Sequence, residues 1–169
     1  MEGYTLTMSI LATPTEAPKP KTKDVTIIAT FYAAILTVMA VAQLYSFDTF
    51  TEHMASLGLP GGIAMGYFLA SFIVVAEVFA LPFLLRMRIS PAFRVFSMLL
   101  GWIVPVVWLK VSIWMVATYS DAVTVGFFGT VVDTMPGWWA VLVSGAFGIL
   151  AAWSAWGMWP LKKRLKRTK

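Results

Sequence analysis

The chain has 169 residues, of which 59% are hydrophobic and only 12% are charged, about half the charged share of an average soluble domain. This composition excludes an ordinary soluble fold and indicates one compact membrane bundle, because four stretches are apolar over about 18 residues or more. The net charge of +5 does not indicate nucleic-acid binding, since the basic residues lie at the ends of the apolar stretches, where they anchor helices against anionic lipid.

The residue types that are missing exclude several kinds of redox chemistry within this chain. Without cysteine there are no disulfides, thiol relays or thiolate-ligated iron–sulfur clusters. The single histidine, His53, excludes a haem held by two histidines of this chain. We find no phosphate-binding loop, nucleophile elbow or metal-ligand motif. We therefore expect no metal and no intrinsic cofactor, although a bundle of this kind could bind a quinone.

Both ends of the chain are predicted to be tails. Residues 1–24 are polar, contain three of the nine prolines and lack the pattern of a cleaved signal peptide, which indicates a flexible tail. Residues 160–169 form a second tail with six basic side chains. Between the tails we predict an all-α, integral membrane four-helix bundle over residues 25–159, with spans at about 25–47, 62–85, 91–118 and 138–159.

The first predicted span has a face of small and aliphatic residues. At helical spacing these are Ala29, Ala33, Leu36, Ala40 and Gln43. Small residues allow a neighbouring helix to approach closely, and the Gln43 amide adds a polar group near the end of the span. This amide either bonds to a neighbouring backbone or belongs to an intramembrane polar site.

The connection over residues 46–61 is polar and is expected to contain a short amphipathic helix that ends at its glycines and proline. His53 lies beside Glu52 in this connection. The histidine is either a solvated loop residue, or a metal ligand or proton carrier, and no second ligand lies near it in the sequence.

The second predicted span contains an acidic residue, Glu77, far inside its apolar run. An intramembrane carboxylate costs several kcal/mol unless it is paired, solvated or protonated, so it marks a candidate functional site. Glu77 shares one helical face with small and aliphatic residues: Gly66, Ala70, Ile73 and Ala80. We therefore expect it to point into the bundle, just before a kink at Pro82.

The third predicted span contains a basic residue, Lys110. It lies about half a turn from the face formed by Gly101, Pro105, Trp108 and Ser112. With a rise of about 1.5 Å per residue, Glu77 and Lys110 differ in depth by roughly 6–10 Å, which two long side chains could bridge. Three interpretations stay open: a buried Glu77–Lys110 pair, separate structural roles, or a site that handles protons or a ligand.

Between the last two predicted spans lies the sequence TVGFFGTVV, whose β-branched and aromatic residues favour a short hairpin-like excursion. The last span has a small-residue face formed by Ser144, Gly148, Ala151 and Ala155. Trp102 and Trp108 lie deeper than the interfacial aromatic belts, so they either pack the bundle or contact a quinone, pigment or lipid.

Loop charge predicts the orientation of the bundle. Twelve of the thirteen Lys and Arg residues lie in the two tails and in the connection at 86–94, whereas the other two connections hold none and carry four acidic residues. The positive-inside rule then places both termini in the cytoplasm, which requires an even number of spans.

Several short motifs resemble the DoxX and MauE group of small bacterial and archaeal membrane proteins. They are LGLP at Leu57–Pro60, the glutamate Glu77, LLR at Leu84–Arg86, and GFFG at Gly126–Gly129, within a four-span order over residues 28–156. The resemblance implies a prokaryotic cytoplasmic (inner) membrane. Together with loop charge, it leads us to expect an outer-loop element that contains His53, Gly126, Phe128 and Gly129. It also implies a link to redox systems such as quinone-linked thiosulfate oxidation and methylamine dehydrogenase maturation.

The chain departs from this family at two places. MauE-like members often have cysteines where this chain has Val125 and Phe127, and relatives commonly have a basic residue where it has Gln43. We therefore expect a non-catalytic accessory or assembly subunit that contacts lipid and other membrane subunits of a respiratory or photosynthetic complex. The alternatives are a quinone-linked oxidoreductase subunit in which Glu77 handles protons, and a small transporter.

Overall fold

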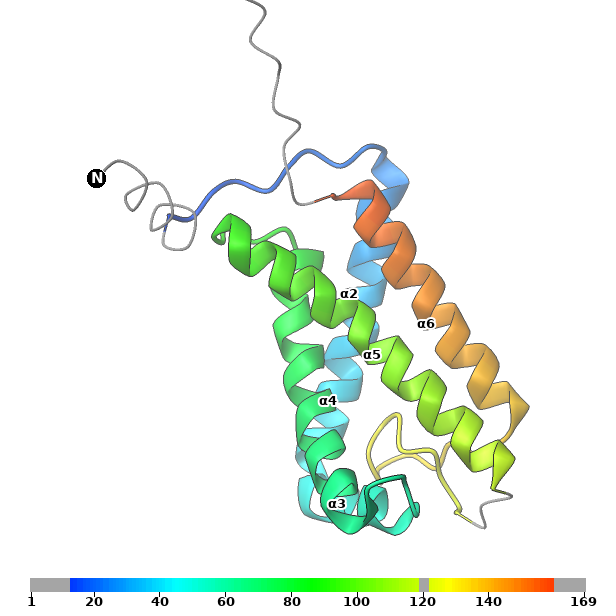
Figure 1. The fold of residues 1–169 in the computed structure, drawn as a ribbon. Helices are drawn as coiled ribbons and strands as arrows, with labels where there is room; N and C mark the ends of the chain where they lie inside the picture. The colour runs from blue at the N-terminus through cyan, green and yellow to red at the C-terminus, as the bar shows by residue number, and fades with distance from the viewer. Residues whose placement is uncertain (1–12, 119–121, 160–169) are drawn as a thin grey trace, which may run out of the picture.

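The computed structural model describes residues 13–118 and 122–159, which form five α-helices and no β-strand. The helices are α2 (Lys23–Tyr45), α3 (Phe47–Ser56), α4 (Gly62–Leu84), α5 (Pro91–Ala117) and α6 (Trp138–Gly157) (Figure 1). All except α3 are long and apolar enough to cross a membrane. The all-α four-span bundle is therefore confirmed, and each predicted span agrees with its helix to within two residues at either end.

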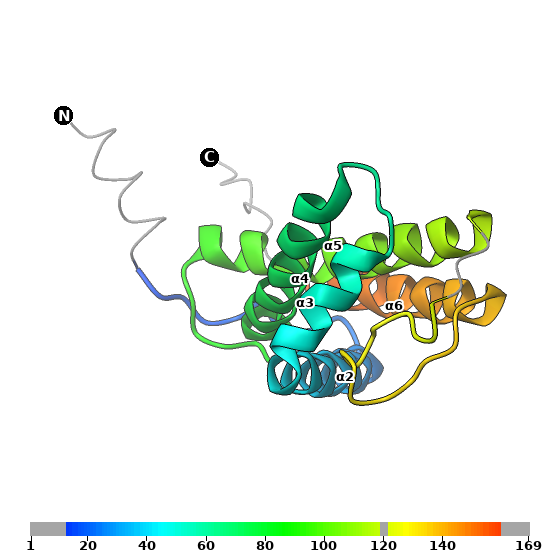
Figure 2. The ribbon, with the colours of Figure 1, turned by 90° about the horizontal axis from the view of Figure 1, so that it is seen from below.

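The four long helices enclose one core. α4 packs against α2, α3 and α5, while α6 packs against α2 and α5. The first and last described residues lie at the same end of the bundle, which we call the terminal end (Figure 1). At the opposite end, which we call the loop end, α3 lies beside the loop over residues 122–137 (Figure 2). The predicted short helix in the first connection is thus α3.

The predicted small-residue faces form the interior of the bundle. In α2, α4 and α5 every member of the predicted face is buried, and in α6 only Gly148 is half-buried. Some of these contacts leave no room for a side chain. A Cβ at Gly66 would collide with the α3 backbone at Met54 and Ala55, and one at Gly157 would collide with Val25 of α2. These two glycines are therefore required for close helix packing.

Two prolines interrupt the hydrogen-bond ladders of the long helices, and side chains of other helices bond to the backbone beside them. Pro105 has no N–H, so the Gly101 carbonyl one turn earlier loses its usual donor. The Tyr32 hydroxyl of α2, which is fully buried, donates a hydrogen bond of 2.8 Å to that carbonyl. A polar bond between two spans thus replaces one inside a span, as the apolar surroundings require.

Near Pro82, Ser97 of α5 bonds to the α4 backbone on both sides of the proline, rather than to the Val78 carbonyl that loses its usual donor. The Phe83 N–H donates to Ser97 Oγ at 3.0 Å, and the Ser97 hydroxyl lies 2.6 Å from the Phe79 carbonyl oxygen. Phe79 and Phe83 are one helical turn apart, so the hydroxyl connects the donor and acceptor on either side of the proline. This bridge also fixes α5 against α4.

Part of the predicted flexible tail lies against the terminal end. The Thr15 N–H donates to the Ile89 carbonyl at 3.1 Å, and the guanidinium of the buried Arg94 donates to the Thr15 carbonyl at 2.6 Å. Further along, the Lys21 N–H donates to Gly157 at 3.1 Å, and the Lys21 ammonium lies 4.1 Å from the centre of the Trp156 ring. Residues 13–22 therefore join the α4–α5 connection to α6, whereas residues 1–12 and 160–169 lie outside the described residues.

Replacing Tyr32 by phenylalanine should destabilise the bundle, because the buried Gly101 carbonyl then has no donor. We expect a loss of about 1–3 kcal/mol of unfolding free energy, measured by denaturant titration of the detergent-solubilised protein. Tyr67→Phe is the matched control, since Tyr67 is 45% exposed, and it should change the stability by less than about 0.5 kcal/mol. Equal effects of the two substitutions would contradict this role of Tyr32.

Candidate functional site

The Glu77 side chain is fully buried and lies where three helices meet. Its Oε1 atom accepts a hydrogen bond from Gln43 Nε2 of α2 at 3.2 Å and a longer one from Trp108 Nε1 of α5 at 3.4 Å. Each of these residues lies on the predicted inner face of its helix. The structure therefore brings together three of the residues that the sequence singles out.

A fourth residue, Phe127, enters this site from the loop over residues 122–137. Its carbonyl oxygen accepts the second Gln43 Nε2 hydrogen at 2.9 Å, and its ring is only 1% exposed. The ring packs edge-on against Trp108, with centroids 4.9 Å apart, and against Phe147 of α6 at 6.0 Å. Gln43, Glu77, Trp108 and Phe127, which we call the carboxyl cluster, therefore connect α2, α4, α5 and this loop.

Two acceptor atoms of the carboxyl cluster have no hydrogen-bond partner: Glu77 Oε2 and Gln43 Oε1. The amide orientation of Gln43 follows from its neighbours, because Nε2 faces two acceptors, the Glu77 carboxyl and the Phe127 carbonyl. An unpaired polar atom in an apolar interior is costly. The cluster therefore retains an unused capacity to accept a proton or a hydrogen bond.

Lys110 does not pair with Glu77. The lysine is exposed, and the single ion pair within the described ranges joins Arg88 to Glu16 at 3.1 Å, at the terminal end. Trp108 faces the core, so Lys110, two residues later on the helix, faces outward between α4 and α5. Of the three open interpretations, the buried Glu77–Lys110 pair is thus wrong.

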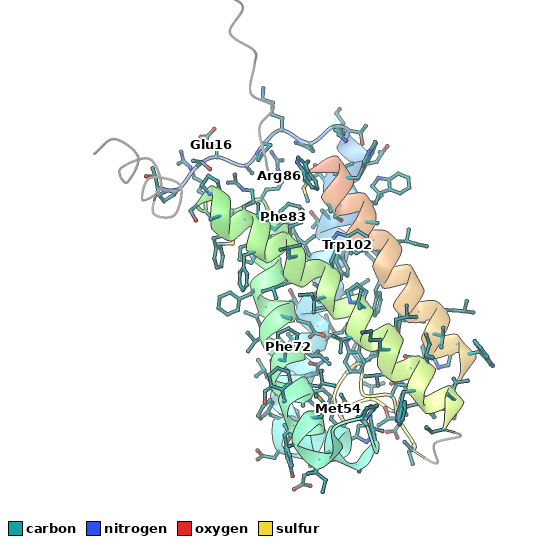
Figure 3. The ribbon with its side chains drawn as sticks, viewed as in Figure 1. Glu16, Met54, Phe72, Phe83, Arg86 and Trp102 are labelled. Carbon is teal, nitrogen blue, oxygen red and sulfur yellow. The ribbon has the colours of Figure 1, made fainter. Side chains whose placement is uncertain are left out.

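Trp102 and Trp108 have different surroundings. Trp108 is fully buried in the carboxyl cluster, whereas Trp102 is 39% exposed. Trp102 lies nearer than Trp108 to the terminal end of the bundle (Figure 3). It lines a separate hollow with Lys21 and Trp156. The two tryptophans therefore do not form one aromatic pocket around Glu77.

The GFFG element forms a turn that folds into the bundle, and residues 122–137 fold back on themselves without forming a β-strand. The ends of this loop are joined by one backbone bond, from the Val125 N–H to the Thr134 carbonyl at 2.8 Å. Gly126 and Gly129 have φ angles of +92° and +60°, a region that side chains disfavour. A Cβ at Gly129 would collide with Ser46 Oγ, so this glycine is needed for both conformation and contact.

Phe127 is the residue of this candidate site that the sequence reasoning missed. The sequence singles out its neighbour Phe128, which is only half-buried, together with the two glycines. Two adjacent phenylalanines in an irregular turn have no periodicity that predicts which ring points inward. The signal that could have found it is the pair of glycines, since they let the backbone between them approach α2 closely.

His53 of α3 lies against the same turn. Its ring carbon Cδ2 would be 3.4 Å from a Cβ at Gly126, and its Nε2 atom is buried without a partner. Burial lowers the pKa of His53 below its ordinary value of 6.5, and a hydrogen bond with the Thr124 backbone acts weakly in the opposite direction. Within the described ranges no three acidic or histidine side chains gather into a metal-binding group.

Comparison of the chain with protein-family models, with curated proteins and with solved structures finds no match. The function must therefore be argued from the carboxyl cluster and from the surfaces of the bundle.

Glu77 variants separate the acceptor role of the carboxyl from its charge. Glu77→Leu leaves hydrogens of Gln43 and Trp108 without an acceptor, so we expect a loss of about 1–3 kcal/mol of unfolding free energy for each unpaired donor. Glu77→Gln keeps an oxygen acceptor and should lose less than about 1 kcal/mol. Denaturant titration of both variants measures the difference, and equal losses would show that the acid itself is required.

His53 should make the stability depend on pH. Because the folded-state pKa is lowered, the unfolded chain binds a proton at a higher pH than the folded chain does. The contribution of neutral His53 is complete above pH of about 6.5 and is lost as the pH falls. We expect a lower unfolding free energy at pH 5.5 than at pH 7.5, and a smaller difference in His53→Gln. An unchanged pH difference in this variant would refute the assignment.

Proposed function

We propose that this protein is a non-catalytic membrane subunit that packs against other transmembrane helices, as an accessory or assembly component of a larger complex. The observation that carries the proposal is an unused small-residue face on α6. A Cβ at Gly145 or at Gly148 would meet no atom within 4 Å, and Ala152 follows on the same side. These glycines thus differ from Gly66 and Gly157, which the bundle needs for its own packing.

This face has the composition of a helix-docking surface. Small residues at membrane-helix interfaces let two backbones approach closely, which strengthens dispersion contacts and weak hydrogen bonds. Glycine is a poor helix former, so two half-buried glycines that no other helix of this chain contacts closely need a reason beyond its own fold. Trp153 and Trp156 lie beside the face, 47% and 57% exposed, and supply large apolar contact area.

The carboxyl cluster supports a structural role for the intramembrane polar residues. The Glu77 carboxyl and the Gln43 amide bond to each other, and they also bond to Trp108 of α5 and to the Phe127 backbone in the loop. A neutral carboxylic acid would avoid the cost of a charge there. We therefore assign Glu77 first to joining α2, α4, α5 and the loop over residues 122–137.

Loop charge and the resemblance to the DoxX and MauE group extend the proposal. The positive-inside rule favours the terminal end in the cytoplasm, with the loop end outside. The resemblance favours a prokaryotic inner membrane and a complex of redox function, respiratory or photosynthetic. Because this chain has no cysteine, its redox connection would run through a partner subunit.

A quinone-linked oxidoreductase subunit is the second candidate. It is favoured by the unpaired Glu77 Oε2 and Gln43 Oε1 atoms, since a proton acceptor beside an indole ring suits quinol oxidation. This candidate requires bound quinone in the purified protein, and a Glu77→Gln variant that folds but loses turnover. Full turnover of that variant in a reconstituted assay would exclude it.

Association should depend on the α6 face. Purification from native membranes in mild detergent should recover the protein with stoichiometric partners, and Gly148→Leu should remove them because its side chain blocks close approach. The fold should be unaffected, since the position is open. Ala146→Leu, on another exposed side of α6, is the matched control and should retain the partners.

The proposal is refuted by either of two results. One is a monodisperse, partner-free species extracted from native membranes under conditions that preserve other complexes. The other is unchanged association in both Gly145→Leu and Gly148→Leu, with helicity and unfolding equal to those of the unsubstituted protein.

A further inference from the structure

We propose that a groove between α4 and α5 near the loop end binds an anionic phospholipid, whose phosphate pairs with Lys110. The groove has a volume of about 580 Å³, within the range of small-molecule sites. Its walls are formed by Met65 and Leu69 of α4 and by Val107 and Trp114 of α5, and Leu59 of the connection after α3 also lines it. None of the four carboxyl-cluster residues lines it.

Lys110 is the one charged residue among those that line the groove, and the rest are apolar except for the indole N–H of Trp114. That N–H already donates to the Leu57 carbonyl at 3.3 Å. No described Asp or Glu oxygen lies within 4.0 Å of the Lys110 ammonium. The groove therefore presents a single cation without a protein counter-ion, beside a surface that suits acyl chains.

Lys110 lies closer to the loop end of α5 than to the middle of the helix. It lies seven residues before Ala117, the last residue of α5, which corresponds to about 10 Å along the helix. The four-carbon stem lets the ammonium reach toward the helix end while its methylenes cover apolar surface. A phosphate at the boundary can thus pair with it, and the acyl chain can follow the groove past Val107 and Leu69.

The positive charge of Lys110 favours an anionic lipid over a neutral amphiphile such as a quinone. A quinone carbonyl would accept one hydrogen bond but leave the positive charge uncompensated in an apolar groove. A phosphodiester neutralises the charge and makes a charge-assisted hydrogen bond as well. An anionic phospholipid is therefore the occupant that fits both the cation and the apolar walls.

The test compares phosphatidylglycerol with phosphatidylcholine of the same acyl chains, added to the delipidated full-length protein in mild detergent. Thermal unfolding and native mass spectrometry should both show preference for phosphatidylglycerol, by about tenfold in apparent affinity. Lys110→Gln should abolish the preference and Lys110→Arg should retain it. Lys21→Gln removes a cation at the terminal end and should leave the preference unchanged.

A second variant tests the groove without changing its charge. Ala117 is exposed and lines the groove, so Ala117→Trp should fill part of the groove, keep the fold and weaken phosphatidylglycerol binding. The proposal is overturned if the unsubstituted protein shows no preference, or if the preference survives Lys110→Gln. It is also overturned if a short-chain ubiquinone, and not phosphatidylglycerol, binds in a Lys110-dependent way. None of these outcomes bears on the α6 face.

Discussion

The hydrogen bonds that the Glu77 carboxyl accepts from Gln43 and Trp108 hold three helices of this bundle together. In a membrane the helices gain little from hydrophobic burial against one another, so the contacts that select one arrangement are close packing and interhelical hydrogen bonds. The Gln43 amide uses both of its hydrogens, one on α4 and one on the backbone of Phe127. The same few atoms thus fix three helices and the loop that closes the loop end.

The backbone beside the prolines Pro82 and Pro105 is also stabilised by hydrogen bonds from other helices. Each breaks the ladder of its own helix in surroundings without water, and a hydroxyl group from another span bonds to the affected backbone. The Tyr32 hydroxyl bonds to the backbone of α5, and the Ser97 hydroxyl bonds to the backbone of α4. The bonds that compensate for the prolines are therefore also the bonds that hold α2 against α5 and α5 against α4. The α6 glycines Gly145 and Gly148 and the exposed Lys110 make none of these bonds.

Much of the architecture could be predicted from the sequence, because helix periodicity is a local property. The inward faces of α2, α4 and α5 follow from spacing alone, whereas the position of Lys110, half a turn from the inner face of α5, leaves its direction open. The hydrogen-bond partners of Glu77 could not be predicted. The positions of residues along two helices do not show how the helices are rotated or tilted relative to each other. Phe127 and the segment over residues 13–22 were also not predictable, since irregular backbone has no period from which to read contacts.

The sequence by itself determined the fold class, the four spans, their buried faces and the presence of an intramembrane carboxyl, since each depends on composition and on the 3.6-residue period. Only the tertiary structure decided which groups Glu77 meets, because a hydrogen bond between spans depends on how rigid helices are placed relative to one another. It also decided at which glycines a neighbouring helix occupies the space of a side chain, and at which glycines of α6 this space is empty. That difference depends on distances between helices, which no single segment encodes.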